Sequence, residues 1–257
     1  MNYIETVGPC LRDMRELMVS NWGKAEAIHQ KDDSAWSIVT AIDIEVEKRM
    51  SLALAKKFSD IAFVGEEAGG DRNAEKFWLM DPIDGTMHYS RGMPFCTSMI
   101  ALIENGHVTF SVIYDFLNDK MYHAQKGKGA FCNEEPIHVS TRDMKNALVA
   151  LETKTHIEKN EHTRKRLRAL TDIINTYSAG FEFVMVATGK FEARICLDPW
   201  GNDYDYAPGS LLVTEAGGVV LNLGSRTYDY RNLNFIASNK PVFEELTSGE
   251  GALFPFA

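Results

Sequence analysis

The sequence predicts an α+β fold built in layers, with helices packed between and around mixed sheets. Three observations support this prediction. A helical repeat occupies residues 41–58, short apolar runs separated by turn residues fill the chain up to residue 133, and strand-like and helical patterns alternate after Ser140. Each sheet or helix must cover an apolar face, and stacked layers provide that cover.

The first third of the chain is expected to be helical, and strands are expected to follow it. The repeat in residues 41–58 has apolar side chains at i, i+4, i+7 and i+8, namely Val46, Met50, Ala53 and Leu54. The runs at residues 61–67 and 77–81 are short and end in acidic residues, so they predict buried strands. Residues 97–133 predict an antiparallel meander, with Asn105-Gly106 as its clearest hairpin signal.

The second half of the chain alternates between strand-like and helical patterns of apolar residues. Strands are expected at residues 147–151, 219–223 and 235–238, and helices at residues 160–174, 181–189 and 205–218. Gly189 and the pair Gly217-Gly218 are the expected helix ends. Without a linker or an internal repeat, residues 1–257 are expected to form a single domain with two lobes, 1–140 and 141–257.

Composition excludes several classes of partner. The net charge of −9 argues against a nucleic-acid surface, and the basic cluster at residues 163–170 has the spacing of a solvated helix face. No segment approaches the roughly 18 apolar residues of a membrane span, and the N-terminal residues lack the apolar core of a signal peptide. The four scattered cysteines are interpreted as reduced thiols. These features predict a cytoplasmic protein without nucleic-acid or membrane partners.

Acidic residues stand where predicted strands end and where a helix begins. Glu66 and Glu67 end one strand, Asp81 ends the next, Asp84 follows three residues later, and Asp205 opens a distant helix. Singly, each has a structural reading as a turn, loop or helix-capping residue. Together in one cleft they would repel each other unless protonated or bound to cations. Oxygen ligands without histidine or cysteine favour Mg²⁺ first and Mn²⁺ next.

The turn between the two aspartates suits an anion as well as a metal. Pro82 fixes its φ near −65°, so Asp81 and Asp84 are held by a stiff turn in which the carbonyl of Ile83 is a further oxygen ligand. Gly85 allows close approach of the chain to a ligand. Thr86 offers a hydroxyl group and, at a helix start, free N–H groups. A metal and an anion side by side indicate phosphate-ester chemistry.

The chain resembles the inositol monophosphatase family of Mg²⁺-dependent, lithium-sensitive phosphatases. The resemblance rests on residues 39–48 (VTAIDIEVEK), 64–67 (VGEE), 78–86 (WLMDPIDGT), 127–133 (GKGAFCN) and 205–218 (DYAPGSLLVTEAGG). It implies an αβαβα sandwich, a homodimer and two or three Mg²⁺ ions per site. The wider superfamily includes fructose-1,6-bisphosphatases and 3′-phosphonucleotide phosphatases.

The resemblance also assigns roles to residues. The metal ligands that it implies are Glu66, Asp81, Asp84, Asp205 and the carbonyl of Ile83. Thr86 and Asp43 match the pair whose hydrogen bond helps to deprotonate the attacking water, and Glu66 matches the water-activating carboxylate. Gly85 and Thr86 match the residues whose amides hold the phosphate. From the sequence alone, Asp43 would be the N-cap of the helix at 41–58.

The segment before Asp205 departs from the family pattern. Trp200 is separated from Asp205 by four residues, which makes Asp203 a rival ligand, although the downstream LLVTEAGG favours Asp205. The family position that contacts substrate hydroxyls is occupied by Cys196 or Asp198. Arg194 is a candidate contact for a second phosphate. Substrate contacts are therefore expected from Asp84, Ala179, Arg194 and Asp198.

These residues predict a phosphomonoesterase for inositol monophosphate or a related small polyol or sugar phosphate. The attacking group would be a metal-activated water. The alternative is a phosphatase for a bisphosphorylated substrate such as fructose 1,6-bisphosphate, NADP or 3′-phosphoadenosine 5′-phosphate. A non-catalytic homologue and a simple cation-binding module are the other readings, and the combination of the acids with Thr86 argues against both.

Overall fold

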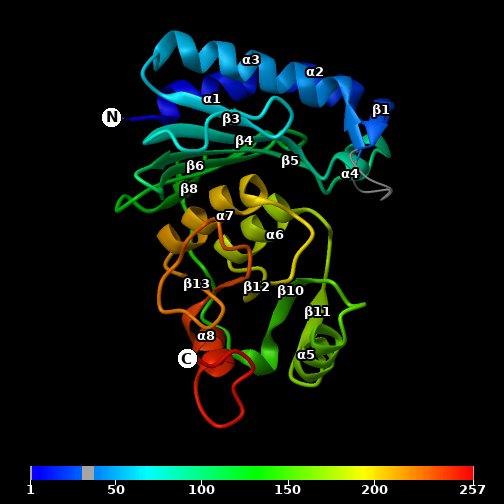
Figure 1. The fold of residues 1–257 in the computed structure, drawn as a ribbon, viewed down its shortest axis with the longest axis vertical. Helices are drawn as coiled ribbons and strands as arrows, with labels where there is room; N and C mark the ends of the chain where they lie inside the picture. Colours follow the sequence, from blue (N-terminus) through cyan, green and yellow to red (C-terminus); the bar gives the residue numbers. More distant parts are fainter. Residues whose placement is uncertain (1, 31–37, 257) are drawn as a thin grey trace.

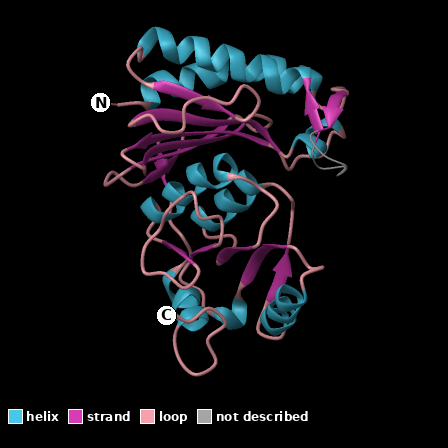
Figure 2. Cartoon of the chain, viewed as in Figure 1, coloured by secondary structure: helices cyan, strands magenta, loops and turns pink. Residues whose placement is uncertain are grey.

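The computed structural model of the chain describes residues 2–30 and 38–256. Residues 1, 31–37 and 257 of the predicted domain lie outside the described ranges. The described chain forms five layers, helix, sheet, helix, sheet and helix, as Figures 1 and 2 show. This confirms the layered α+β prediction. Across residues 2–30 and 38–256, no helix has the length and apolar character needed to cross a membrane.

The first outer layer consists of helices on one face of the larger sheet (Figure 1). These are α1 (Ile4–Asp13), α2 (Arg15–Asn21) and α3 (Ala41–Lys57). The predicted helix at 41–58 is thus confirmed, and Val46, Met50 and Leu54 are buried on its inner face. Beneath this layer Trp78 is fully buried, with its ring 5.7 Å from that of Tyr3. This apolar contact fixes the outer helices on the sheet that carries the site.

The larger sheet has seven strands in chain order. They are β3 (Ala62–Gly65), β4 (Lys76–Asp84), β5 (Thr97–Glu104), β6 (His107–Asp115), β7 (Lys120–Gln125), β8 (Ala130–Cys132) and β9 (Glu135–Pro136). β3 and β4 are parallel and the later pairs are antiparallel, which confirms the predicted meander. Asn105 and Gly106 have φ of 50° and 75°, as a tight hairpin turn requires.

The central layer consists of α6 (Ala179–Ala187) and α7 (Asp203–Glu215), which lie between the two sheets in Figure 1. Both helices were predicted, but α7 begins two residues earlier, at Asp203. The helices approach closely because Gly209 of α7 lies against the ring of Phe183, where a Cβ atom would clash. The layer positions the first turns of both helices beside the ends of β4 and β5.

The smaller sheet has five strands in the order β11-β10-β12-β14-β13. They are β10 (Leu148–Thr153), β11 (Asp172–Ile174), β12 (Ala193–Leu197), β13 (Val219–Asn222) and β14 (Phe235–Ser238). The last layer consists of α5 (Glu158–Arg168) and α8 (Lys240–Thr247). Shorter elements are β1 (Ala27–Gln30), β2 (Ile38–Thr40), α4 (Thr86–Ser90) and η1 (Met144–Asn146).

Two predictions for the second half need correction. The helix expected at residues 160–174 ends at Arg168, and Asp172–Ile174 forms β11, parallel to β10. Ile173 and Ile174 are β-branched and pair at the open edge of β10, where a strand satisfies backbone groups that a longer helix would not. Strand β12 and helix α8 were not predicted. The lobe boundary at residue 140 stays a prediction, although each large sheet takes its strands from one side of it.

Candidate active site

β4 ends in the two aspartates that the sequence singles out, Asp81 and Asp84. Asp81 pairs with Met99 and Asp84 with Thr97, so three steps along β4 match two steps along β5. In a regular strand, residues three apart face opposite sides of the sheet. The bulge around Pro82, which has no N–H group for the ladder, turns both aspartates toward one cavity.

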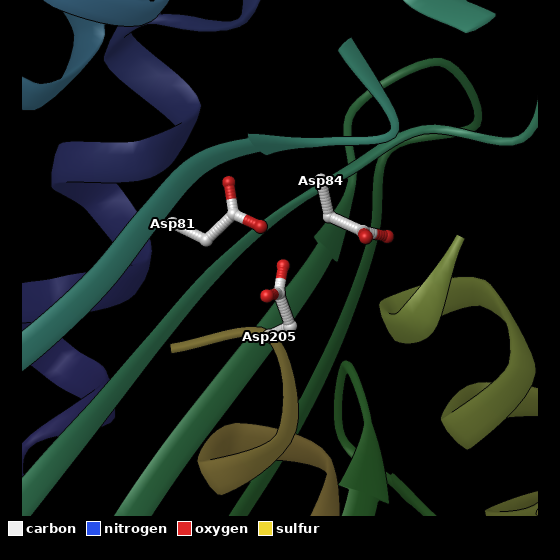
Figure 3. A group of neighbouring side chains, drawn as sticks. All are labelled: Asp81, Asp84 and Asp205. Atoms are coloured by element: carbon white, nitrogen blue, oxygen red, sulfur yellow. The ribbon is translucent and has the colours of Figure 1, made fainter. Parts of the chain in front are cut away.

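Asp205 joins these two residues from the first turn of α7. The side chains of Asp81, Asp84 and Asp205 each offer a carboxylate oxygen, and these oxygens lie within 4.8 Å of one another. Figure 3 shows Asp81 and Asp84 on β4 and Asp205 on α7 side by side, with the carboxylate of Asp84 turned toward α6. We call this set the aspartate cluster. The rival residue Asp203 is not part of it, because its carboxylate forms an ion pair with Arg72.

The aspartate cluster concentrates negative charge in a buried place. Burial, and next the charges of Glu66 and Asp205, raises the pKa of Asp81 well above its usual range. Burial and Glu66 likewise raise the pKa of Asp205. Oδ1 of Asp81 is buried and has no hydrogen-bond partner among the described residues. Such a site favours a proton or a cation.

The donor set fits a hard divalent cation. Glu66 lines the same cavity as the aspartate cluster and is a fourth acidic residue there, and Ile83 is also part of the cavity wall. Among the described residues, the group that could hold a metal ion consists of aspartates, and such oxygen donors suit Mg²⁺ or Mn²⁺. Oδ1 of Asp81 gives the strongest argument for a cation in this site. A bound ion would supply the partner that this oxygen lacks among the described residues.

Asp84 differs from Asp81 in being held by the start of α6. Its Oδ2 accepts hydrogen bonds from Oγ of Ser178 at 2.5 Å and from the amide of Gly180 at 2.9 Å. Its Oδ1 accepts one from the amide of Ala179 at 3.0 Å. Burial raises the pKa of Asp84, and these donors counteract the rise. The predicted substrate contact Ala179 therefore lies beside the cluster, but its amide already binds Asp84.

Asp43 and Thr86 meet as the family resemblance implies. Oγ1 of Thr86 lies 3.2 Å from Oδ1 of Asp43 and 2.9 Å from the carbonyl oxygen of Ile83. The N-cap of α3 is Thr40, and Asp43 is its partner in a capping box through Oδ2. Burial raises the pKa of Asp43 to about 7. Asp43 is thus both a capping residue and the carboxylate acceptor of a hydrogen bond from the Thr86 hydroxyl.

Gly85 occupies a backbone conformation that few other residues tolerate. Its φ is 77°, and a Cβ atom there would clash with the carbonyl oxygen of Phe95. α4 begins at the next residue, Thr86. Both residues line the cavity, so the predicted phosphate-binding amides lie next to the aspartate cluster.

Arg194 is held inside the protein by two carboxylates. It is 1% exposed, and it forms ion pairs with Glu152 and Glu182. Its guanidinium group also lies 5.2 Å from the ring centroid of Phe183. Since both partners are negative, the charge of Arg194 is balanced before any ligand arrives. It lines the cavity but has no uncompensated charge for a second phosphate.

The two candidates for the hydroxyl-binding position do not present a polar group to the cavity. Asp198 does not line the cavity, and its Oδ2 lies 3.2 Å from Nζ of Lys159. Cys196 is buried, and its Sγ lies 3.8 Å from Oε2 of Glu152 on the neighbouring strand. The acidic residue that this part of the smaller sheet contributes to the cavity is Glu152.

Glu152 was missed from the sequence although a signal was present. It follows the apolar run of β10, as Glu66 and Asp81 follow theirs. Its Oε1 accepts hydrogen bonds from the amides of Trp200 and Gly201 at 2.9 and 3.1 Å and from the hydroxyl of Tyr206 at 2.9 Å. Glu152 therefore anchors the segment that leads into α7 and Asp205.

All these elements enclose one cavity of about 710 Å³. Its wall includes the predicted site residues except Asp43, Asp198 and the alternatives Cys196 and Asp203. The size is in the range of small-molecule sites, which is roughly 300–1,000 Å³. Carboxylates for cations, a hydroxyl beside an acceptor, and a tight turn with amides make hydrolysis of a phosphate ester the chemistry that this cavity suits.

Comparison with known proteins agrees with this chemistry. The model of the inositol monophosphatase family matches residues 7–250. Inositol monophosphatase 1 of Bos taurus is 32% identical over 233 residues, covering 85% of this chain and 83% of the relative. Fructose-1,6-bisphosphatase/inositol-1-monophosphatase of Thermotoga maritima is 31% identical over 245 residues, covering 92% and 91%.

A solved structure shows the same fold. An IMPase of Thermotoga maritima superposes with a TM-score of 0.85 at 27% identity, covering 95% of each chain. The family model spans nearly the whole chain and includes the residues that line the cavity described above. The chain belongs to the inositol monophosphatase family of phosphate monoester hydrolases.

Proposed function

We propose that the protein hydrolyses the phosphate monoester of a small polyol or sugar, with inositol monophosphate as the first candidate, in a metal-dependent reaction. The observation that carries this proposal is the aspartate cluster with its unpartnered Asp81 oxygen. The names of the bovine and Thermotoga relatives support the substrate class. The alternative of a bisphosphorylated substrate uses the same catalytic residues.

The residues fit two or three Mg²⁺ ions, with Mn²⁺ as a substitute. Glu66, Asp81, Asp84, Asp205 and the carbonyl of Ile83 are the proposed ligands. When bound, such cations would neutralise the carboxylates and lower the pKa of a water molecule. Without this neutralisation the carboxylates would repel a phosphate dianion.

The other residues position and deprotonate the water. Thr86 is near enough to Asp43 to pass it a proton, since Oγ1 of Thr86 and Oδ1 of Asp43 are 3.2 Å apart. Thr86 in turn accepts a proton from the water, and Glu66 orients that water. An acceptor with a pKa of about 7 is well matched to a base at neutral pH. The amides of Gly85 and Thr86 hold the phosphate oxygens.

Three further properties belong to this proposal. Sensitivity to lithium and assembly as a homodimer are expected from the family resemblance stated above. A cytoplasmic location is expected from the scattered cysteines, which are interpreted as reduced thiols. Activity with and without lithium, sedimentation and cell fractionation test the three properties separately.

The proposal is tested by replacing the Thr86 hydroxyl. Thr86→Val is expected to lower kcat for inositol 1-phosphate with Mg²⁺ by about 100-fold, because a positioned proton acceptor contributes at least this much. Thr86→Ser should keep most of the activity. Initial rates of phosphate release give both numbers.

Thr214→Val is the matched control, because this exposed hydroxyl on α7 binds only the carbonyl of Ser210 in its own helix. It should leave the rate unchanged. A normal rate in Thr86→Val would remove the Thr86 assignment. Absence of phosphate release from every polyol and sugar monoester tried with Mg²⁺ or Mn²⁺ would remove the proposed function itself.

A further inference from the structure

A buried glutamate of α3, Glu47, is not among the catalytic residues described above. It is 2% exposed and does not line the cavity. A glutamate is seldom buried this completely unless its carboxylate has partners, because an unpaired charge is costly away from water. The partners of Glu47 therefore indicate what this buried charge does.

These partners are two backbone amides of the loop that follows β3. Oε2 of Glu47 accepts a hydrogen bond from the amide of Glu67 at 2.9 Å, and Oε1 accepts one from the amide of Ala68 at 2.7 Å. Burial raises the pKa of Glu47, and these two amides counteract the rise. Both carboxylate oxygens of Glu47 are thus used to hold the loop.

The loop closes tightly around this carboxylate. Gly65 and Gly69 exchange two backbone hydrogen bonds, at 3.0 and 3.1 Å. A Cβ atom on Gly65 would lie 2.1 Å from Cδ of Glu47. The carboxylate therefore fills the space that a side chain at position 65 would need. We call residues 65–69 the Glu66 loop.

The Glu66 loop carries the carboxylate that is proposed to bind a cation and to orient the water. Glu66 lies between Gly65 and Glu67, and Glu47 contacts both of these neighbours. The amide of Glu66 donates to the carbonyl oxygen of Met80 in β4 at 3.0 Å. The backbone of Glu66 is therefore held from two sides, by α3 and by β4, while the residue lines the cavity.

The helix that supplies Glu47 also supplies Asp43. The two residues are four positions apart in α3, so their side chains lie on the same face of the helix. Asp43 accepts a hydrogen bond from the hydroxyl of Thr86, and Glu47 holds the Glu66 loop. One face of α3 thus contacts both groups that the proposed function places beside the attacking water.

We propose that Glu47 is a positioning residue of the active site, whose carboxylate holds the Glu66 loop so that Glu66 keeps its place in the cavity wall beside the aspartate cluster. This inference rests on the proposed function, since it concerns the role of Glu66 in that function. Glutamine at position 47 would keep one acceptor oxygen but would turn an NH₂ group toward a backbone N–H group. One of the two loop hydrogen bonds would then be lost.

Binding of Mg²⁺ without substrate tests this proposal. Isothermal titration calorimetry with Mg²⁺ alone gives the Kd of the unchanged protein, Glu47→Gln, Glu66→Gln and the double variant. Glu47→Gln should weaken binding by about tenfold, because a partner that orients a metal ligand contributes about 10–100-fold in affinity.

The double variant shows whether Glu47 acts through Glu66. Glu66→Gln keeps the aspartate cluster, so a weaker affinity for Mg²⁺ can still be measured. In this background, Glu47→Gln should add less than about twofold to the Kd, because the side chain that it positions has already lost its charge. A purely structural defect would add the same factor in both backgrounds.

Glu215→Gln is the matched control. Glu215 ends α7, does not line the cavity, and accepts hydrogen bonds from the amides of Gly127 and Gly129, at 2.8 Å each. The control therefore weakens the same kind of contact outside the cavity. It should leave both the Kd for Mg²⁺ and kcat for inositol 1-phosphate unchanged, whereas kcat should fall in Glu47→Gln.

Denaturant unfolding establishes which variants are folded. If Glu47→Gln does not fold, Glu47→Asp takes its place in the same set of titrations. Aspartate keeps the negative charge but is shorter by one methylene group, so it also weakens the contacts with the loop amides.

The outcomes separate this inference from the proposed function. An unchanged Kd in Glu47→Gln would refute the positioning role, and so would a tenfold loss that persists in the Glu66→Gln background. In both cases phosphate release by the unchanged protein would leave the proposed function standing. If the unchanged protein releases no phosphate, the proposed function fails, and the Mg²⁺ titrations still decide whether Glu47 positions Glu66.

Discussion

The cavity has an acidic wall, the aspartate cluster, and a basic wall with Arg164 and Arg168 of α5, and the two are built in different ways. The aspartate cluster lies at the end of β4 and the start of α7, in the middle of the layered structure, and Asp81 is 1% exposed. The basic wall is one face of α5, an outer helix that contacts solvent (Figure 1). Arg168 is exposed and is held by one long hydrogen bond to Ile173.

This difference indicates which part of the site tolerates change. The carboxylates are fixed by a bulge, by the start of α6 and by the segment that Glu152 anchors, so moving one of them disturbs several layers. An exposed helical arginine is replaced at a cost of a few tenths of a kcal/mol in stability. The proposed catalytic residues are thus fixed by the packed interior, whereas the exposed face of α5 can change at little cost in stability.

Removing one carboxylate from the acidic wall should give the largest effect. Asp81→Asn is expected to reduce kcat by about 1000-fold and to abolish the rise of Tm on adding Mg²⁺, because Asp81 is a proposed cation ligand with an unpartnered oxygen. Rates and thermal unfolding with and without Mg²⁺ measure both effects.

The control for Asp81→Asn is Asp60→Asn, which removes an equal charge from an exposed turn. It should change neither quantity. Full activity of Asp81→Asn would show that the aspartate cluster is not the metal site. The buried carboxylates would then have no catalytic role to compare with the exposed face of α5.

A change at Glu152 should have an intermediate effect. Glu152→Gln removes one of the two negative charges that pair with the buried Arg194. It also weakens the acceptor for the Trp200 and Gly201 amides. We therefore expect the free energy of unfolding to fall by about 2 kcal/mol. Denaturant unfolding measures the loss. Because the anchored segment leads to Asp205, the affinity for Mg²⁺ should also fall.

Glu158→Gln, on the exposed start of α5, is the comparison for Glu152→Gln. It should leave both the free energy of unfolding and the Mg²⁺ affinity unaltered. Normal Mg²⁺ affinity in a destabilised Glu152→Gln would restrict Glu152 to a structural role.

The smallest effect concerns the pH dependence of the metal-free protein. Burial raises the pKa of Asp43 to about 7, and burial with Glu66 raises the pKa of Asp81. Groups with a raised pKa in the folded state favour folding while protonated, and this contribution is lost as the pH rises through the folded pKa. In a chelator, Tm should therefore fall by about 2–4 °C between about pH 6.5 and about pH 8.

Mg²⁺ should reverse this pH trend. Cations bind ionised carboxylates, so the rise of Tm caused by Mg²⁺ should be larger at the higher pH. Differential scanning calorimetry at both pH values provides the measurement. If the Tm of the metal-free protein increased from about pH 6.5 to about pH 8, burial would not raise the pKa of these carboxyl groups as inferred.

Local patterns were sufficient for much of the fold. The repeat in α3 and the Asn105-Gly106 turn act within a few residues, so the sequence predicts them directly. Strand β11 was assigned to a helix because its pairing with β10 lies outside the local pattern. Strand β12 was missed since Arg194 interrupts its apolar run, and its two carboxylate partners come from other elements.

The candidate site divides in the same way. The types and spacing of Asp81, Asp84, Gly85 and Thr86 predict oxygen ligands next to an anion-binding turn without any knowledge of the fold. Asp43 was identified through the family resemblance alone, because a residue in the first turn of a helix gives no local sign of a partner 43 residues away. Glu152 gave a local sign, an acid at a strand end, but nothing showed which strand end faced the cavity.

What the sequence by itself determined is the kind of chemistry, because three of the proposed ligands, Asp81, Ile83 and Asp84, lie in one short stretch. What only the tertiary structure decided is the state of each charge. Asp84 is bonded by residues 94 to 96 positions away, Arg194 is neutralised by Glu152 and Glu182, and Arg168 remains exposed. The physical reason is that a charge is neutralised by whatever lies within a few ångströms of it, and in this fold those neighbours come from distant parts of the chain.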